Sequence, residues 1–426
     1  MAHVHALAKQ LPDERYLVNL CEHRYCFIVA FCAALVRGQT NLLPSSRVPD
    51  VVAEVIATNP GSYRCDDEMV KRAMNGANLS HAGHAEHPAA PGALTDIAIP
   101  ATHIAAIAFT SGSTGKPKAH IKRWGSFLQS TPMNAGAIRR CLAEKYGDAR
   151  PHLVATVPPQ HMYGMETSVL LPLAADMVVH EARPLFPADV AAALNDIPAP
   201  RVLVTTPVHM RALLASGQKF PDIAAVVSAT APLDAALALS IEREWKTTML
   251  EMFGSTETCV IAVRLTAKDE AWTLYRGVTL TPLEDSAEAS SPWFDAPTLL
   301  QDVIEVLDDR RFLIRGRNVD MIEVAGKRAS LADLTRRLLN VPGVEDAVIF
   351  QPDAVGASGV RRVAALVVAP SLSAESIVEQ LSRSVDPVFI PRPLMIVPVL
   401  PRNELGKMPR DRLLAALKAG GMEEAR

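Results

Sequence analysis

The chain has 426 residues, of which 49% are hydrophobic and 21% charged, a composition that argues against long disordered tails and favours two or three structural units. Its 43 basic and 46 acidic residues give a net charge of -3, which argues against a nucleic-acid or anionic-membrane surface. The six cysteines form no CxxC pair, so we expect buried free thiols in a cytoplasmic protein rather than metal or disulfide roles.

The N-terminal part shows neither a secretory signal nor a membrane segment. Residues 1–15 carry acids and have no apolar core, unlike a signal peptide, and the apolar run 25–36 is shorter than the ~20 residues that span a bilayer. Residues 22–37 are predicted to form a packed helix that ends at Gly38. Residues 75–101 predict a surface excursion, in which three evenly spaced histidines make a metal site conceivable, although no thiol lies nearby to complete it.

The middle of the chain alternates β-rich runs with helical stretches. The β-rich runs are residues 104–109, 153–157, 177–180, 201–205, 223–227 and 248–253, and the helical stretches between them include 189–194 and 233–244. This βαβ order is typical of a parallel or mixed sheet that is covered on its faces. We therefore predict an α/β fold for a large N-terminal domain, residues 1–316.

The remainder predicts a small α+β domain, residues 317–426. A hairpin is predicted just before this domain, at 303–315. The domain itself is predicted to contain a helix at 331–339, strands at 347–351 and 363–368, a helix at 374–384 and a last helix after Pro409. A short hinge around residues 317–320 is predicted to join the two domains, with a cleft between them.

A loop rich in hydroxyls, glycines and lysines directly follows the predicted strand at 104–109. It reads Thr110-Ser111-Gly112-Ser113-Thr114-Gly115-Lys116-Pro117-Lys118. Glycines let the backbone approach a polyanion, hydroxyls donate hydrogen bonds and lysine neutralises charge, so the loop predicts a phosphate site. A Walker A loop is excluded, because Thr110 stands in place of its first Gly and Pro117 in place of its Ser or Thr. Taken alone, the loop could also be a turn without function.

This loop resembles the phosphate-binding signature of the adenylate-forming superfamily, which contains acyl-CoA synthetases, nonribosomal-peptide adenylation domains and firefly luciferase. Two further segments match in the expected order. Met252-Phe253-Gly254-Ser255-Thr256-Glu257-Thr258 resembles the aromatic-Gly-x-Thr-Glu motif of that family. Ser228-Ala229-Thr230-Ala231-Pro232-Leu233 resembles its Ser-Gly-Gly-Ala-Pro-Leu segment, with Ala229 and Thr230 in place of both glycines.

The resemblance continues around the predicted domain junction. Asp302, Arg317 and Gly326 have the spacing of the family's ribose-binding Asp, core Arg and later Gly. Two departures occur there: the usual Thr-Gly before the Asp is absent, and Val319 stands where the hinge commonly has Asp or Lys. Near the C-terminus, the loop that ends at Lys407 resembles the loop whose lysine reaches into the active site during adenylation.

These matches imply roles for individual residues. Phe253 would flank the adenine, Thr256 would contact the α-phosphate and Glu257 would hold Mg²⁺, which agrees with the preference of hard cations for carboxylates. With Lys407 and His161, the last two complete the catalytic set that we predict. The nucleotide-binding set implied by the resemblance is Thr110, Ser111, Gly112, Ser113, Thr114, Gly115, Lys118, Thr230, Ala231, Pro232, Phe253, Asp302 and Arg317.

The segment 159–166 bears on the identity of the acid substrate. It resembles the family's substrate-side motif, with its histidine at His161. That histidine could equally be structural. Met162 and Tyr163 are candidates to line a flat apolar pocket, and Glu166 is a candidate acceptor for a ring hydroxyl. The segment therefore favours an aromatic acid such as a hydroxybenzoate, with a medium or long fatty acid as the alternative.

The segment with Gly326 and Arg328 bears on the thiol acceptor. It resembles the loop that lines the family's pantetheine tunnel. This loop does not distinguish coenzyme A from a separate phosphopantetheinylated acyl carrier protein. The chain also resembles compact stand-alone ligases that prime aryl-polyene pigment pathways.

The sequence as a whole predicts an AMP-forming acid–thiol ligase that uses ATP and Mg²⁺, releases pyrophosphate and then rotates its small domain to admit the thiol. Two alternatives stay open. One is a catalytically silent nucleotide-binding protein, and the other is an adenylating enzyme with an oxygen or amine acceptor.

Overall fold

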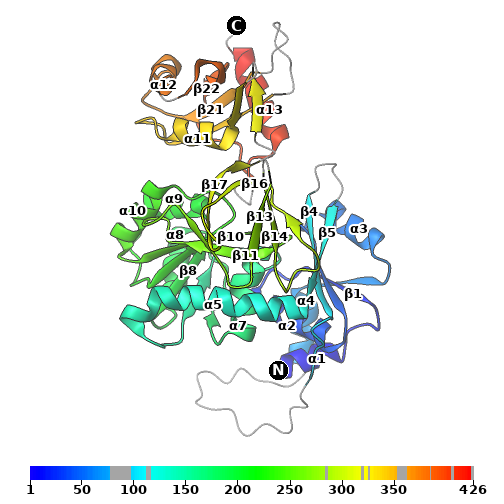
Figure 1. Cartoon of the computed structure of the whole chain (residues 1–426). Coiled ribbons are helices and arrows are strands. Elements are labelled where there is room, and N and C mark those ends of the chain that lie inside the picture. Colours follow the sequence, from blue (N-terminus) through cyan, green and yellow to red (C-terminus); the bar gives the residue numbers. More distant parts are fainter. Residues whose placement is uncertain are drawn as a thin grey trace. The chain divides into compact units, whose positions relative to one another are not determined.

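The chain divides into two compact units (Figure 1). The computed structural model describes residues 1–76, 97–111, 117–283, 286–317, 321–324, 327–352, 362–383, 385–403 and 407–423. The first unit comprises Met1–Thr279 and Ser290–Thr298, and the second comprises Leu280–Ala289 and Leu299–Arg426. The predicted boundary after residue 316 stays a prediction, and the hairpin that precedes it groups with the second unit.

The first unit holds most of the secondary structure. Its helices are α1 (Ala2–Ala8), α2 (Arg24–Val36), α3 (Pro49–Thr58), α4 (Asp67–Asn75), α5 (Trp124–Tyr146), α6 (Met162–Met165), the π-helical η1 (Glu166–Leu170), α7 (Leu171–Ala174), α8 (Pro187–Asn195), α9 (Pro207–Ala215) and α10 (Ala235–Trp245). Its strands are β1 (Tyr16–Asn19), β2 (Thr40–Leu43), β3 (Ser62–Cys65), β4 (Ile104–Ser111), β5 (Pro117–Arg123), β6 (His152–Ala155), β7 (Val178–Val179), β8 (Arg201–Thr205), β9 (Ala225–Ser228), β10 (Thr248–Ser255), β11 (Cys259–Arg264) and β12 (Trp272–Leu274).

An N-terminal sheet has the strand order β3-β1-β2-β4-β5. The first four strands run parallel, and β4 and β5 form an antiparallel hairpin. One apolar cluster joins this sheet to α1, α2 and α4 through residues such as Leu7, Phe27 and Val70, and a second cluster packs Val52 and Val55 of α3 against the sheet. Because the sheet is covered on both faces, β4 carries a continuous apolar run from Ile104 to Phe109 rather than alternation.

In the first unit, a central sheet runs in the order β12-β11-β10-β9-β8-β6-β7. Strands β6 to β10 are parallel, whereas β11 and β12 pair antiparallel to their neighbours. Helices α8, α9 and α10 pack against buried residues of this sheet such as Leu203 and Val226. Side-chain caps start two of these helices, with Thr206 before Pro207 in α9 and Asp234 before α10, as expected for hydroxyl and carboxylate caps. The α/β fold predicted for this part of the chain is confirmed.

A buried arginine connects the two sheets. Arg24 starts α2 and is 1% exposed. Its guanidinium donates to the carbonyl oxygens of Ala155 at 2.6 Å and Val157 at 3.3 Å, and to the hydroxyl of Ser168 in η1. Burial lowers the pKa of Arg24 to about 10. Several hydrogen bonds at once are what a buried cation requires.

The second unit contains the predicted small α+β region. Its elements are β13 (Thr279–Pro282), β14 (Ala287–Ser290), β15 (Thr298–Leu299), β16 (Asp302–Val306), β17 (Arg311–Arg317), β18 (Met321–Val324), β19 (Lys327–Ser330), α11 (Leu331–Leu339), β20 (Asp346–Phe350), β21 (Ala364–Val368), α12 (Ala374–Leu381), η3 (Pro387–Phe389), β22 (Leu394–Ile396) and α13 (Arg410–Glu423). One apolar cluster packs α11 and α12 against the β20-β21-β22 sheet, and another involves Leu413 of α13.

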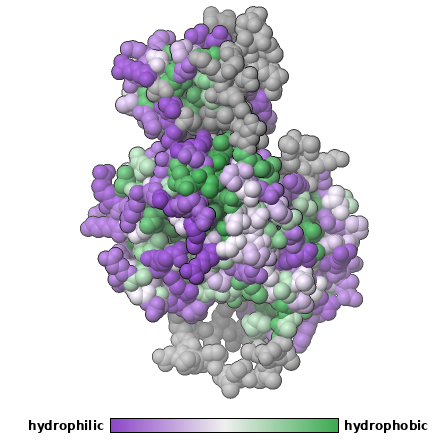
Figure 2. Space-filling model, in the orientation of Figure 1, coloured by the Kyte–Doolittle hydropathy of each residue, from purple (hydrophilic) through white to green (hydrophobic). Residues whose placement is uncertain are grey.

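The surface of the first unit and the cysteines can be compared with what the composition predicted. Hydrophilic and apolar residues are interspersed on the face of the first unit seen in Figure 2. All six cysteines are free thiols, and four of them are buried, as predicted. Within the described residues, no helix combines the length and the apolar character that crossing a membrane requires. The three histidines of the predicted surface excursion lie outside the described residues.

Candidate active site

The hairpin of β4 and β5 carries the predicted phosphate loop. Thr110 and Lys118 are register partners near the end of the hairpin that leads into the loop, followed by Ser111 and Pro117. The loop residues Gly112, Ser113, Thr114 and Gly115 lie outside the described residues. The Thr110 hydroxyl lies 3.0 Å from Nε2 of His120, so the end of β4 and the face of β5 are tied together beside the loop.

Strand β5 presents three basic residues on one face. Lys118, His120 and Lys122 alternate along the strand and therefore point to the same side. His120 and Lys122 are buried, while Lys118 is exposed. Nε2 of His120 lies 3.6 Å from a carboxylate oxygen of Glu257, and Lys122 donates from Nζ to the Glu257 backbone carbonyl at 2.7 Å. The structure thus brings Glu257 against the hairpin of the phosphate loop.

Glu257 stands in a tight connection between β10 and β11. Ser255 pairs with Cys259, and a bulge separates the pairs of Phe253 and Gly254. A Cβ at Gly254 would lie 2.0 Å from the Cys259 carbonyl oxygen, so only glycine fits there. Cys259 itself has a φ of 60°. The turn therefore has a constrained backbone that projects Thr256 and Glu257 from its tip.

The charge of Glu257 is stabilised within this turn. Burial alone would raise the pKa of its carboxyl, but hydrogen bonds from its own amide and from the Ser255 hydroxyl, together with the positive charges of His120 and Lys118, lower that pKa. For His120, burial lowers the pKa against the opposing attraction of Glu257. The turn thus favours the ionised form of the Glu257 carboxylate.

The predicted adenine-facing segment follows β9. Its Thr230 has a φ of 77°, a left-handed conformation that favours glycine. The segment is anchored by Glu251, which is 3% exposed and accepts from the Leu233 amide at 3.2 Å and from Arg264 at 2.7 Å. Burial raises the pKa of Glu251. Phe253, at the end of the neighbouring strand, is the aromatic side chain predicted to flank the base.

Trp272 of β12 lies beside that aromatic residue. Its ring centroid is 5.4 Å from that of Phe253, and the guanidinium of Arg264 lies 4.5 Å from the centre of the Trp272 ring.

The adenine-facing segment after β9 is completed by Ala231 and Pro232. Ser228, the last residue of β9, is the register partner of Glu251 in β10. Because carboxyl ends of parallel strands meet at one edge of a sheet, the predicted adenine-facing and metal-binding segments lie at the same edge.

The segment predicted to face the acid forms the start of a continuous helical stretch. His161 precedes α6 as its N-cap residue. Tyr163 is buried, and its hydroxyl donates to the carbonyl oxygens of Val227 at 2.9 Å and Thr205 at 3.2 Å. Met162 is buried beside the thiol of Cys259, with 3.9 Å between the sulfur atoms. The Tyr163 hydroxyl therefore holds the ends of β8 and β9 instead of facing an open pocket.

Glu166, the predicted acceptor for a ring hydroxyl, also has partners within the protein. Both of its carboxylate oxygens lie 3.1 Å from the Val260 amide, and one accepts from Asn134 Nδ2 at 3.1 Å. Burial raises the pKa of Glu166 to about 7. The structure assigns these oxygens to the protein's own donors, and a contact with substrate stays a prediction.

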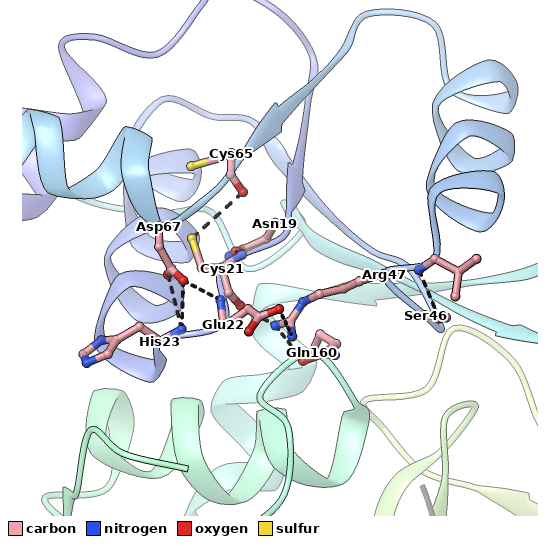
Figure 3. A network of polar contacts seen from close by, with 10 residues as sticks. Asn19, Cys21, Glu22, His23, Ser46, Arg47, Cys65, Asp67 and Gln160 are labelled. Carbon is pink, nitrogen blue, oxygen red and sulfur yellow. Dashed lines mark hydrogen bonds and ion pairs between the residues drawn. The ribbon is translucent and has the colours of Figure 1, made fainter. Parts of the chain in front are cut away.

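An arginine that sequence reasoning missed supports the loop before α6. Arg47 donates to Oε1 of Gln160 at 3.3 Å and to the Cys21 carbonyl, and it lies 3.6 Å from the Glu22 carboxylate (Figure 3). Asp67 accepts from the backbone amides of Glu22 and His23 in the same network. Gln160 is thereby fixed one residue before His161.

The second unit holds the other predicted site residues. Asp302 and Arg317, the predicted ribose-binding and core positions, are register partners across β16 and β17, so their backbone positions are adjacent in one hairpin. Lys407 is exposed, and its backbone exchanges two hydrogen bonds with Asn403: Lys407 N donates to Asn403 Oδ1 at 2.9 Å and Asn403 N to Lys407 O at 2.7 Å. Arg328 lies in β19, and Gly326 falls outside the described residues.

Within the described residues, no group of three His, Cys, Asp or Glu side chains could hold a metal ion by itself. A single carboxylate nevertheless fits Mg²⁺, because that ion usually takes one or two protein carboxylates and completes its shell with water and substrate phosphate. The ionised Glu257 beside Thr256 meets this requirement.

Comparison with known proteins identifies the family. A model described as AMP-binding enzyme matches residues 4–284. The chain belongs to the AMP-binding enzyme family. A 4-coumarate–CoA ligase of Halorhodospira halophila is 28% identical over 323 residues, covering 73% of this chain and 77% of the relative. The mitochondrial malonate–CoA ligase of Homo sapiens is 24% identical over 382 residues, covering 73% and 65%.

The fold of this AMP-binding enzyme also occurs in solved structures. The anthranilate CoA ligase in complex with anthranoyl-AMP superposes with a TM-score of 0.76 at 15% identity, covering 98% of this chain and 92% of that one. The predicted family and fold are confirmed, and so is the predicted class, an AMP-forming acid–thiol ligase.

Proposed function

We propose that this enzyme activates an aromatic carboxylic acid with ATP, releases pyrophosphate and transfers the acyl group from the adenylate to a phosphopantetheine thiol. The observation that carries the proposal is the position of Glu257. Its carboxylate has a lowered pKa and lies 3.6 Å from His120 on the hairpin of the phosphate loop. Phosphoryl-group chemistry needs this combination of an ionised carboxylate and phosphate-binding groups.

In the adenylation step the residues act mainly by binding and by electrostatics. Lys118 and the loop hydroxyls would bind the triphosphate, Thr256 would contact the α-phosphate, and Lys407 would neutralise the charge that develops there. Mg²⁺, held by Glu257, would supply further charge neutralisation to the phosphates. A carboxylate oxygen of the acid attacks the α-phosphorus in line, the bond to pyrophosphate breaks, and an acyl-adenylate forms.

An aromatic acid is supported by the relatives. The match to a 4-coumarate–CoA ligase of Halorhodospira halophila covers 73% of this chain. Met162 and Tyr163 begin the helix that follows His161, and both are buried. His161 is the proposed contact with the acid.

The thiol acceptor is proposed to be coenzyme A or the phosphopantetheine of a separate acyl carrier protein. The relatives named as CoA ligases support coenzyme A. Both acceptors present the same pantetheine arm, so Gly326 and Arg328 are proposed to line its path in either case.

Acid-dependent exchange of labelled pyrophosphate into ATP tests the adenylation step. The panel comprises 4-hydroxybenzoate, 4-coumarate, benzoate, octanoate and malonate, each with enzyme and Mg²⁺. We expect exchange with one or more aromatic acids. Exchange with octanoate alone would replace the aromatic acid by a fatty acid, and ATP binding without exchange on any acid would favour a silent nucleotide-binding protein.

Mass spectrometry of the products then identifies the acceptor. The active acid is incubated with ATP and either coenzyme A or a phosphopantetheinylated carrier protein. We expect an acyl thioester on one of them, together with AMP. An ester or amide product would reject the thiol acceptor.

A further inference from the structure

Two buried charged residues hold the turn that carries Thr256 and Glu257. Lys122 is 5% exposed, and its ammonium donates to the carbonyl oxygen of Glu257 at 2.7 Å. The contact therefore fixes the backbone of the residue whose side chain projects from the turn. A charged hydrogen bond in a buried setting is one of the stronger polar contacts in a protein.

The far end of the same turn is held by a buried carboxyl group. Glu166 is 1% exposed, and it accepts from the amide of Val260, three residues after Glu257. Asn134 of α5 donates to the same carboxylate, and the hydroxyl of Tyr275 donates to Asn134 Oδ1 at 2.9 Å. The orientation of Glu166 is therefore set by a chain of buried partners.

The backbone of the turn explains why it needs this support. Gly254 has no room for a side chain, and Cys259 has a left-handed φ of 60°. Non-glycine residues in that region are strained unless their surroundings hold them. Burying a lysine and a glutamate also costs free energy, and a turn with no further role could be closed by apolar packing.

We propose that Lys122 and Glu166 are positioning residues that hold the two ends of the Mg²⁺-bearing turn, so that Glu257 meets the metal–nucleotide complex in one fixed geometry. This inference rests on the proposed function, in which Glu257 holds Mg²⁺. It gives Glu166 a role different from the contact with a ring hydroxyl expected from the sequence.

The test measures binding of ATP with Mg²⁺ and of ATP in EDTA by calorimetry, alongside the melting temperature. Lys122→Met keeps the length of the side chain and removes its donor. We expect it to weaken binding of the Mg²⁺ complex about tenfold, as the loss of one charged hydrogen bond implies, with a change below about twofold in EDTA. Lys145→Met, an exposed lysine paired with Asp222, is the matched control and should match the wild type.

Two substitutions at Glu166 separate positioning from substrate contact. Glu166→Met leaves the Val260 amide unpaired, so binding of the Mg²⁺ complex should weaken about tenfold. In Glu166→Gln the amide oxygen still accepts from Val260, and Asn134 can reverse its own amide, so binding should stay within about threefold of wild type. A large change in the KM of the acid with Glu166→Gln would instead identify a substrate contact and overturn the proposal.

Other outcomes are equally decisive. Variants that melt earlier yet bind the Mg²⁺ complex with wild-type affinity would show that the two residues serve only the core, and an equal loss with and without Mg²⁺ would show general damage to the nucleotide site. Either result overturns the proposal. Lys122→Gln, which keeps a donor, replaces Lys122→Met if the latter does not fold. Calorimetry needs no turnover, so the result stands even if no acid supports pyrophosphate exchange.

Discussion

The two units support their candidate site residues in different ways. In the first unit, buried charges lie directly behind the site: Lys122 and Glu166 hold the turn of Glu257, and Glu251 holds the segment after β9. In the second unit, Lys407 is exposed and is held by hydrogen bonds with Asn403, four residues away. Substitutions in the first unit should therefore alter chemistry and stability together, whereas those at Lys407 should alter chemistry alone.

Lys407→Ala is the substitution with the largest expected effect on the reaction. Removing one charge that stabilises the transition state typically costs on the order of 10²–10³ in rate, so pyrophosphate exchange should fall by about that factor. Because Lys407 is exposed, the melting temperature should not change. Thiol attack on a supplied acyl-adenylate is the internal control, and an equal loss in both half-reactions would contradict the role assigned to this lysine.

Glu166 predicts that the stability of the first unit depends on pH. Its pKa is about 7 in the folded protein, against 4.5 as its ordinary value. Between these values the folded protein keeps a proton that the unfolded chain has released, so the free energy of unfolding decreases as pH rises from 4.5 to 7 and is level above that. Relative to Glu166→Gln, the wild type should lose on the order of 3 kcal/mol over this range.

Urea unfolding of both proteins at pH 5 and pH 8 measures this difference. A constant gap between wild type and Glu166→Gln at the two pH values would show that Glu166 keeps its ordinary pKa. Such a result would weaken the contrast between the units, because the glutamate would then be as well solvated as a surface group.

Thr230→Gly should stabilise the first unit by about 1 kcal/mol. Thr230 has a φ of 77°, where a side chain costs roughly 1–2 kcal/mol, and the greater freedom of glycine in the unfolded chain offsets part of the gain. Thr206→Gly is the contrasting variant: Thr206 has a φ of -124° and caps α9 through its hydroxyl, so this substitution should lose stability rather than gain it. Thermal unfolding of both variants measures the difference, and equal shifts would refute strain at Thr230.

Asn403→Ala should have the smallest effect. It removes the side-chain acceptor for the Lys407 amide, a contact worth about 0.5–1.5 kcal/mol, and so should slow adenylation about threefold without changing the melting temperature. Asn340→Ala, at the end of α11 in the same unit, is the control and should be silent. If Asn403→Ala lost as much stability as the first-unit variants, the contact between Asn403 and Lys407 would serve the fold of the second unit and not only the position of Lys407.

The features predicted correctly from the sequence were those that depend on neighbouring residues. The helix at 331–339 coincides with α11 (Leu331–Leu339), and the strand run at 201–205 with β8 (Arg201–Thr205). The long helix α5 was missed, because Pro132 lies inside it and two glycines interrupt its apolar pattern. Tertiary packing of its buried face outweighs these local signals.

The supports of the site could not be predicted from spacing. Lys122 is 135 residues from Glu257 along the chain, and Glu166 is 94 residues from Val260. Lys118, His120 and Lys122 alternate in the sequence, but the strand on which they form a basic face was not predicted from it. What that face opposes depends on the pairing of two sheets, which local patterns do not specify.

Arg24 has a consequence for how the first unit loses its structure. Its guanidinium belongs to α2, beside the N-terminal sheet, while its acceptors at Ala155, Val157 and Ser168 belong to the region of the central sheet. Separating the two sheets would leave this cation without those partners until water reached it, at a cost of several kcal/mol. The sheets are therefore expected to unfold in a single cooperative transition, so that damage near the N-terminus is felt at the nucleotide site.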